Sequence, residues 1–317
     1  MNEIVVRVRE LSKQFGDNRA LDAVSFEMKQ GEVVGYVGPN GSGKTTTMRI
    51  LLGLLPPDGG SIEIFGHDVQ REFAHIGPRL GAVLDAHCLH PQLTVRETLM
   101  FYAELYGLNR SQRQENIAWL AGQMGLEQVM PARTKTLSKG MRQRLAFARS
   151  LVHRPDLLFL DEPFDGIDTE TQRHLREMVR DLAREQGVTI FLTSHDLHEV
   201  EQLADRVNIL KQGHIVACDT TENLKRSLHR NRIDIHFHAQ MDVTYLQSVL
   251  AGTGFHGTIN LQEGGYAATI ELQNGDPADV VLEKLIADGI RLRAFAPVKT
   301  SLEDAYFDVI DGPPAAS

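Results

Sequence analysis

The sequence predicts an α/β core followed by a smaller α+β domain, and three observations support this prediction. Continuous apolar runs at 33–37, 157–160 and 188–193 have the composition of strands that are buried on both faces. The longer segments between them carry apolar residues at helical spacing. Beyond about residue 230, short strand-like and helix-like segments follow in a different order, which indicates a second domain.

Composition narrows the class of protein. The chain has 317 residues, enough for about two domains, and its net charge of −9 disfavours a broad nucleic-acid surface, so no nucleic-acid partner is expected. The two cysteines, Cys88 and Cys218, form no C-x-x-C pair, which suits a reducing compartment. No apolar run approaches the ~20 residues that cross a bilayer, and the N-terminus lacks a signal-peptide pattern. We therefore expect a cytoplasmic protein.

The first 30 residues predict an antiparallel pair of strands. Residues 4–11 and 24–28 have strand character, and a polar turn at 16–18 separates them. Phe15 lies beside this turn. Two interpretations stay open for its ring: it belongs to the core, or it is exposed and stacks on a planar ligand.

The loop after the strand at 33–37 fits the phosphate-binding pattern G-x-x-x-x-G-K-[ST]. Apolar residues at helical spacing follow at 46–55, so the loop joins a buried strand to a helix, as the motif requires. Backbone N–H groups and the helix N-terminus would surround phosphate oxygens, Lys44 would add a positive charge, and Thr45 would offer a hydroxyl to Mg²⁺. The expected nucleotide-binding residues are Gly38, Pro39, Asn40, Gly41, Ser42, Gly43, Lys44, Thr45 and Thr46. An ordinary glycine-rich turn is the weaker interpretation.

A helical insertion is predicted in the middle of the core. Short strands at 61–65 and 80–84 precede it, and segments 94–106 and 111–124 have helical spacing. We place this insertion at about 86–155.

Four side chains that could ligate a metal follow the strand at 80–84, namely Asp85, His87, Cys88 and His90. Their spacing matches no zinc pattern. We expect no metal other than Mg²⁺.

A second potential anion site lies at the start of the helix that follows this insertion. Ser138 is a good N-cap, and Gly140 would allow a ligand to approach the helix N-terminus closely. On propensity alone, a capped surface helix is the simpler interpretation.

Two carboxylates follow the buried strand at 157–160. Asp161 could hold Mg²⁺ through its waters, and Glu162 could orient an attacking water. If the strand continued through both residues, their side chains would point to opposite sides. A solvated acidic turn is the weaker interpretation beside a phosphate-binding loop.

His195 follows the next buried strand, at 188–193, after a turn at 165–168 and a helix. Ligands gather at the carboxyl ends of parallel strands in open sheets. We therefore expect Gly38, Asp161 and His195 to converge on one crevice, although a single histidine there could be a plain loop residue.

The last part of the chain predicts a small ferredoxin-like domain. A closing hairpin at 207–217 and a short linking helix precede it. The order is then βαββαβ, with a final amphipathic helix at 301–310. The expected strands are 233–237, 257–261, 267–272 and 290–296, and the expected helices are 243–250 and 277–287.

In this order the motifs resemble the ATP-binding subunit of ABC transporters, over residues 1 to about 220. The resemblance implies a P-loop NTPase core of the ABC type, with an antiparallel β subdomain and the helical insertion. Residues 1–219 would form this ATP-binding domain, 220–230 a linker helix, and 231–317 a ferredoxin-like accessory domain with a regulatory or dimer-stabilising role.

The resemblance also implies a role for each motif. Residues 38–45 resemble the Walker A loop, 157–161 the Walker B strand, and 165–168 the D-loop. Lys44, Glu162 and His195 would be catalytic, with Glu162 similar to the catalytic glutamate and His195 to the switch histidine. The remaining roles are Mg²⁺ binding by Thr45, Asp161 and Asp85, adenine stacking by Phe15, and nucleotide contact by Ser138, Gly140 and Asp168.

Two departures from the family pattern are visible. Residues 137–141 resemble the LSGGQ signature, with Lys139 in place of a glycine and Met141 in place of glutamine, while the two positions that bind γ-phosphate across the dimer are kept. Asp85 occupies the place of the Q-loop glutamine, where it would either join the Mg²⁺ shell or repel the γ-phosphate. These features and the Ser-Leu-Glu-Asp run at 301–304 resemble exporters of the ABC-2 class.

The resemblance finally implies partners. ATP and Mg²⁺ would be the cofactors, two copies would form an ATP-sandwich homodimer, and residues 85–106 would dock an integral membrane permease on the inner face of the cell membrane. The main alternative is a soluble ABC-type ATPase of DNA repair or translation. Repair types carry a long coiled coil and translation types usually two cassettes, and this sequence has neither. A non-hydrolysing regulator is disfavoured by the intact Walker A, Walker B and switch residues.

Overall fold

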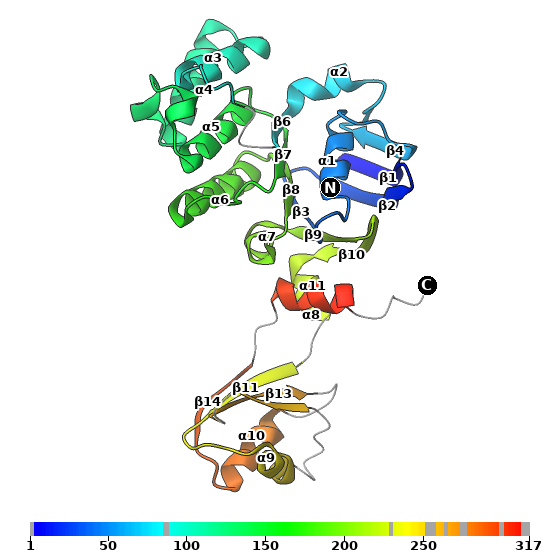
Figure 1. Cartoon of the computed structure of the whole chain (residues 1–317), viewed down its shortest axis with the longest axis vertical. Coiled ribbons are helices and arrows are strands. Elements are labelled where there is room, and N and C mark those ends of the chain that lie inside the picture. Colours follow the sequence, from blue (N-terminus) through cyan, green and yellow to red (C-terminus); the bar gives the residue numbers. More distant parts are fainter. Residues whose placement is uncertain are drawn as a thin grey trace. The chain divides into compact units, whose positions relative to one another are not determined.

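The computed structural model describes residues 3–84, 89–227, 231–250, 258–262, 266–272, 278–297 and 301–311. The chain divides into two compact units (Figure 1). One unit comprises residues 1–221 together with 309–317, and the other comprises residues 222–308. We describe each unit by itself.

The first unit begins with an antiparallel sheet of order β2-β1-β4-β5. Its strands are β1 (Ile4–Phe15), β2 (Asn18–Lys29), β4 (Gly59–Ile64) and β5 (His67–Asp68). The expected antiparallel start is confirmed, but β1 and β2 are longer than the alternation predicts. The pairing register of the two strands shifts between Val8 and Leu11, where Glu10 has a positive φ of 48°. Such a bulge interrupts the period-2 pattern without ending the strand.

A six-stranded sheet of order β10-β9-β3-β8-β7-β6 forms the centre of the first unit. All neighbours pair in parallel except β9 and β10, which form the closing hairpin. The strands are β3 (Val33–Val37), β6 (Leu80–Val83), β7 (Leu157–Asp161), β8 (Thr189–Ser194), β9 (Arg206–Lys211) and β10 (His214–Thr220). The predicted apolar runs at 33–37, 157–160 and 188–193 therefore lie side by side in the interior of this sheet, which explains why they are continuous.

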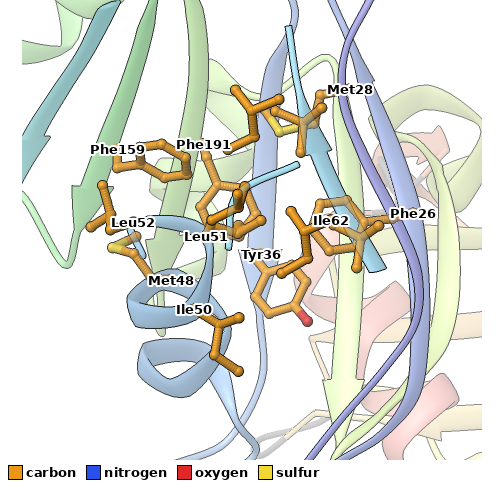
Figure 2. Packing of buried hydrophobic residues seen from close by; sticks show 14 of the residues in the cluster. Phe26, Met28, Tyr36, Met48, Ile50, Leu51, Leu52, Ile62, Phe159 and Phe191 are labelled. Atoms are coloured by element: carbon orange, nitrogen blue, oxygen red, sulfur yellow. The ribbon is translucent and has the colours of Figure 1, made fainter. Parts of the chain in front are cut away.

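Helix α1 (Lys44–Leu51) packs in the core shared by the two sheets. Figure 2 shows its Met48 and Leu51 beside Tyr36 and Phe191 of the parallel sheet. The rings of Tyr36 and Phe191 lie 5.1 Å apart, centroid to centroid. This helix starts and ends earlier than the expected 46–55, because Lys44 already has helical geometry and Gly53 adopts a left-handed φ of 67°. The loop between β3 and α1 is thus fixed by packing on both of its sides.

The helical insertion is present as predicted. Its helices are α3 (Val95–Leu105), α4 (Arg110–Gln123) and α5 (Lys139–Leu151). Thr94 and Glu97 form a capping box at the start of α3, and Asn109 and Gln112 form one at the start of α4. The short helix α2 (Phe73–Ile76) is not apparent from the spacing, because four residues are too few to show a helical period. Helices α6 (Thr169–Arg184) and α7 (Leu197–Leu203) complete the core.

The second unit contains one antiparallel sheet of order β12-β13-β11-β14. Chain order is β11 (Asn231–Phe237), α9 (Val243–Leu250), β12 (Thr258–Leu261), β13 (Ala267–Leu272), α10 (Ala278–Ala287) and β14 (Leu292–Pro297). This is the βαββαβ order that the sequence predicts. Ile235, Leu246, Ile270 and Leu285 form the centre of its core. Helices α8 (Thr221–Ser227) and α11 (Leu302–Asp311) flank this arrangement in sequence.

None of the helices in the described ranges combines the length and the apolar character that a bilayer crossing requires.

Candidate functional site

The loop between β3 and α1 has a backbone that only glycine permits at several positions. Gly41 and Gly43 have positive φ values of 80° and 112°. A Cβ atom on Gly38 would lie 2.4 Å from the carbonyl oxygen of Leu210 and 2.6 Å from Oγ of Ser42. The glycines therefore allow the loop to curl over the start of α1, where backbone N–H groups gather without intrahelical partners.

Lys44 closes this loop from within. Its Nζ donates to the carbonyl oxygen of Gly38 at 2.7 Å and to that of Pro39 at 3.3 Å. The side chain is only 7% exposed. Burial lowers the pKa of Lys44, whereas the nearby carboxylates of Glu162 and Asp161 raise it. The ammonium is thus held inside the loop, near the carboxylates of Asp161, the last residue of β7, and of Glu162, which follows it.

The fit of the loop to phosphate is supported by an unsatisfied hydroxyl. Ser42 is buried, and its Oγ has no hydrogen-bond partner among the residues that the structure describes. A buried polar atom without a partner costs about 1–3 kcal/mol, so a ligand oxygen at this point would stabilise the loop. Thr45 is exposed in the first turn of α1, where its hydroxyl is accessible to a ligand or a cation, and Thr46 is half-buried.

Asp161 stands at the end of β7, and a residue of the neighbouring strand holds it in place. Oγ1 of Thr193, in β8, donates to Oδ1 of Asp161 at 2.6 Å. Burial raises the pKa of Asp161, while this hydrogen bond and Lys44 lower it. A cation beside this carboxylate would offset the cost of burying its charge.

Glu162 does not continue the strand, which ends at Asp161, so the alternation that a continued strand would give does not arise. Glu162 has a positive φ of 46°, which re-aims its side chain. Its backbone N–H donates to the carbonyl oxygen of Thr193 at 3.1 Å. Its Oε2 accepts from the backbone N–H of His195 at 3.1 Å and lies 2.7 Å from Nδ1 of His195. A carboxylate and an imidazole are thereby brought into direct contact.

These contacts bring the side chains together at the carboxyl ends of β3, β8 and β7, which are neighbours in the sheet. Of the residues in the convergence argument, Gly38 takes part through its contact with Lys44, Asp161 through Thr193, and His195 through Glu162, and a shared ligand crevice at this point stays a prediction. Thr193 was not singled out from the sequence. Its position at the end of a buried strand was the available signal, but its role depends on β8 lying beside β7.

Ser138, Gly140 and Asp168 form a separate group at the starts of α5 and α6. Ser138 caps α5, accepting from the N–H of Met141 at 3.1 Å, and Asp168 caps α6 through Thr171, a contact that lowers the pKa of Asp168. A Cβ atom on Gly140 would lie 2.9 Å from Oδ2 of Asp168. No hydrogen bond within the described ranges joins this group to the Gly38–Thr45 loop. Each of the three residues therefore has a structural role within its own chain.

The structure treats two further predicted residues, Phe15 and Asp85, differently: it describes the first but not the second. Phe15 ends β1 with its side chain 48% exposed, and Nζ of Lys13 lies 5.6 Å from its ring centroid. The exposure excludes the core interpretation of Phe15 and leaves a ring face open. Asp85, like His87 and Cys88, lies outside the described residues. Among the residues described, no group of three or more acidic, histidine or cysteine side chains could hold a metal ion.

Comparison with known proteins identifies the class. Residues 21–165 match the family model described as ABC transporter. The chain is 36% identical over 233 residues to the bacitracin transport ATP-binding protein BcrA of Bacillus licheniformis, with 74% of each chain covered. It is 33% identical over 305 residues to the daunorubicin/doxorubicin resistance ATP-binding protein DrrA of Streptomyces peucetius, with 96% of this chain and 92% of the relative covered.

Solved structures agree with this family. A structure of the ATP-binding subunit of an ABC transporter has 28% sequence identity and a TM-score of 0.66, covering 70% of this chain and 92% of the other. A dimeric, post-hydrolysis structure of the ATP-binding cassette MJ0796, bound to ADP and Pi, has 25% identity and a TM-score of 0.63, covering 68% and 98%. The chain belongs to the ATP-binding subunits of ABC transporters, and it is an ATPase of the exporter class.

Proposed function

We propose that two copies of this chain enclose ATP between them and that hydrolysis energises export through a membrane permease. The observation that carries the dimer is that the residues expected to contact nucleotide fall into two groups. Lys44, Asp161, Glu162 and His195 lie together at the carboxyl ends of β3, β7 and β8, whereas Ser138 and Gly140 form a group of their own, and no hydrogen bond among the described residues joins the two groups. A second copy would bring its Ser138 and Gly140 to the nucleotide. The dimeric MJ0796 structure supports this arrangement.

The nucleotide would be held by the residues of the loop. Backbone N–H groups of 38–45, the hydroxyl of Ser42 and the ammonium of Lys44 would bind the phosphate oxygens, and Phe15 would stack on the adenine. Thr45 and Asp161 would bind Mg²⁺, which would neutralise charge on the phosphates. Waters and phosphate oxygens would complete the shell, as is usual for Mg²⁺.

Glu162 would act as the base. Its carboxylate lies 2.7 Å from Nδ1 of His195, which orients it, and it would accept a proton from the attacking water. Nε2 of His195 would then contact the γ-phosphate. The starting point of the reaction is therefore a pair of side chains that are already in contact before ATP binds.

The permease would dock beside the helical insertion. A groove of about 350 Å³ lies between β6 and α3, and its lining includes Phe73, Leu84, Tyr102 and Tyr106. Further along α3, Leu105 is 66% exposed. An apolar groove of this kind suits the apolar face of a helix from the partner. Docking there would place the chain on the inner face of the cell membrane.

The transported compounds would be antibiotic-like molecules. BcrA is named for bacitracin transport and DrrA for daunorubicin and doxorubicin resistance. The alternative of a DNA-repair or translation ATPase is not favoured by these relatives.

The dimer can be tested with Ser138→Arg in a Glu162→Gln background. The larger side chain at the start of α5 is expected to abolish ATP-driven dimerisation, because it would occupy the place of the γ-phosphate of the second copy. The affinity of the monomer for ATP should be unchanged, because the loop and α1 are intact. Loss of the cap alone costs about 1 kcal/mol. Light scattering after size-exclusion chromatography measures the dimer, and fluorescent-ATP titration measures binding.

Ser111→Arg, at an exposed position of α4, is the matched control. It should dimerise with ATP as the parent does. A dimer that persists with Ser138→Arg would contradict the sandwich arrangement, as would an equal loss in the control.

The Q-loop position gives a second prediction. Asp85→Gln is expected to keep ATPase activity and to shift its Mg²⁺ dependence, since the variant would remove one carboxylate from the metal shell. Phosphate release is measured across a Mg²⁺ titration at fixed ATP, with Asp17→Asn, in the first turn, as control. An unchanged titration would exclude metal contact by Asp85.

A further inference from the structure

Glu199 is a buried carboxyl group that the proposed mechanism does not use. It lies in α7, directly after the segment that carries His195, and only 6% of it is exposed. Burial, followed by the neighbouring Asp196 carboxylate, raises the pKa of Glu199 to about 7. A carboxyl group of this kind is costly to bury, so its contacts call for an explanation.

The contacts of Glu199 lead to both sides of His195. Oε2 of Glu199 is 3.4 Å from Oγ of Ser194, the residue before His195. The same Oγ accepts from the N–H of Asp196, the residue after His195, at 2.9 Å. Oδ1 of Asp196 in turn accepts from the N–H of His198 at 2.9 Å and from that of Glu199 at 3.2 Å. These hydrogen bonds thus hold the loop at 194–196 in place from its buried side.

His195 makes the outward contact of the same loop. Its backbone N–H and its Nδ1 both meet Oε2 of Glu162. We propose that Glu199 is a positioning residue of the ATPase reaction, which holds, through Ser194, the loop that presents His195 to Glu162. This inference rests on the proposed roles of Glu162 and His195.

The charges that face Glu199 come from several elements. Asp196, next to α7, and Glu162, after β7, disfavour its ionised form, whereas Arg176 of α6 and the hydroxyl of Ser194 favour it. The protonated carboxyl donates to Ser194, and the ionised carboxylate accepts from it, so both forms can hold the loop. The ionised form, however, adds a negative charge near Glu162 and the expected site of the polyphosphate. Turnover should therefore be lower when Glu199 is ionised.

Two substitutions in the purified full chain separate the effect of the Glu199–Ser194 hydrogen bond from the effect of the negative charge on Glu199. Glu199→Met fills a similar volume without a carboxyl hydrogen bond, and it is expected to lower kcat about tenfold with the KM for MgATP unchanged, because Glu199 does not touch the nucleotide. Glu199→Gln keeps the hydrogen bond and should restore kcat to within about threefold. The ratio of kcat for Glu199→Gln to kcat for the wild type should be near one at pH 6 and rise above pH 7.

Control variants show whether a change in kcat comes from the positioning role of Glu199 or from another cause. Glu177→Gln removes an exposed carboxylate from α6 and should leave kcat and its pH profile unchanged. If His195→Ala lowers kcat but Glu199→Met does not, the positioning role of Glu199 is wrong. If His195→Ala retains the wild-type rate, the assignment of His195 itself fails. A loss that appears in KM alone would also overturn the inference, whereas a ratio that does not change with pH would overturn only the expected effect of the Glu199 charge on turnover. Should Glu199→Met fail to fold, Ser194→Ala carries the test: it removes the hydroxyl through which Glu199 holds the loop and should lower kcat with the KM for MgATP unchanged, and a wild-type kcat in this variant would overturn the inference.

Discussion

Replacing Glu162 by glutamine is expected to lower ATP turnover by roughly 10²–10⁴-fold, with nucleotide binding retained. Glutamine has nearly the same shape, so its amide oxygen can still accept from the backbone N–H of His195, a contact of 3.1 Å in the wild type. It cannot take a proton from water. Binding should persist because Lys44 and the loop remain intact. Single-turnover phosphate release measures the chemical step, and equilibrium titration with a fluorescent ATP analogue measures binding.

Glu170→Gln provides the matched control for this variant. Glu170 is an exposed glutamate in the first turn of α6. Its turnover should equal that of the wild type. A Glu162→Gln protein that hydrolyses ATP at nearly the wild-type rate would show that another group serves as the base.

Glu199→Gln is expected to stabilise the fold at alkaline pH. The pKa of Glu199 in the folded state is about 7, against an ordinary value of 4.5, so folding is opposed by the cost of ionising a buried carboxyl. That cost is absent below about pH 4.5, grows as pH rises between the two values, and is complete above pH 7. At 1.36 kcal/mol per pKa unit, it amounts to about 3 kcal/mol. The glutamine variant avoids it.

Thermal unfolding midpoints at pH 5 and pH 8 test this prediction. The variant should melt several degrees higher than the wild type at pH 8, and the difference should largely vanish at pH 5. Glu177→Gln, on the exposed side of α6, should show no pH-dependent difference. An equal midpoint for Glu199→Gln and wild type at pH 8 would mean that the carboxyl is solvated or compensated in solution.

The parts of the fold that were predictable from sequence are those where one signal dominates. Strands β3 and β7 match their apolar runs because both are buried in the interior of the parallel sheet. The loop at 38–45 was predictable because a backbone that curls around phosphate oxygens requires glycines, a lysine and a threonine at fixed spacing, and all of them lie within one short segment. By contrast, the full length of β1 was hidden by a register shift near Glu10, where the periodic pattern breaks but the hydrogen-bonded ladder continues.

The parts of the site that were not predictable depend on contacts between segments distant in sequence. Thr193 acts on Asp161 because β8 lies beside β7, and nothing in either segment alone indicates this pair. In the sequence, Glu199 is simply an acidic residue in a short helical segment. Only its burial against Ser194, seen in the structure, makes it a candidate positioning residue. The direction of the Glu162 side chain depends on a positive φ, which is rare for glutamate and cannot be read from its neighbours.

The contact between Gly140 and Asp168 has an evolutionary consequence. A methyl group at Gly140 would collide with the carboxylate that caps α6, so selection for stability alone would keep glycine at this position. Ser138 is likewise favoured as the cap of α5. These two positions could thus survive in a lineage that had lost ATP hydrolysis, whereas Glu162, which caps no helix, would drift. An inactive descendant of this ATPase should be sought by the loss of its glutamate rather than by the loss of its signature.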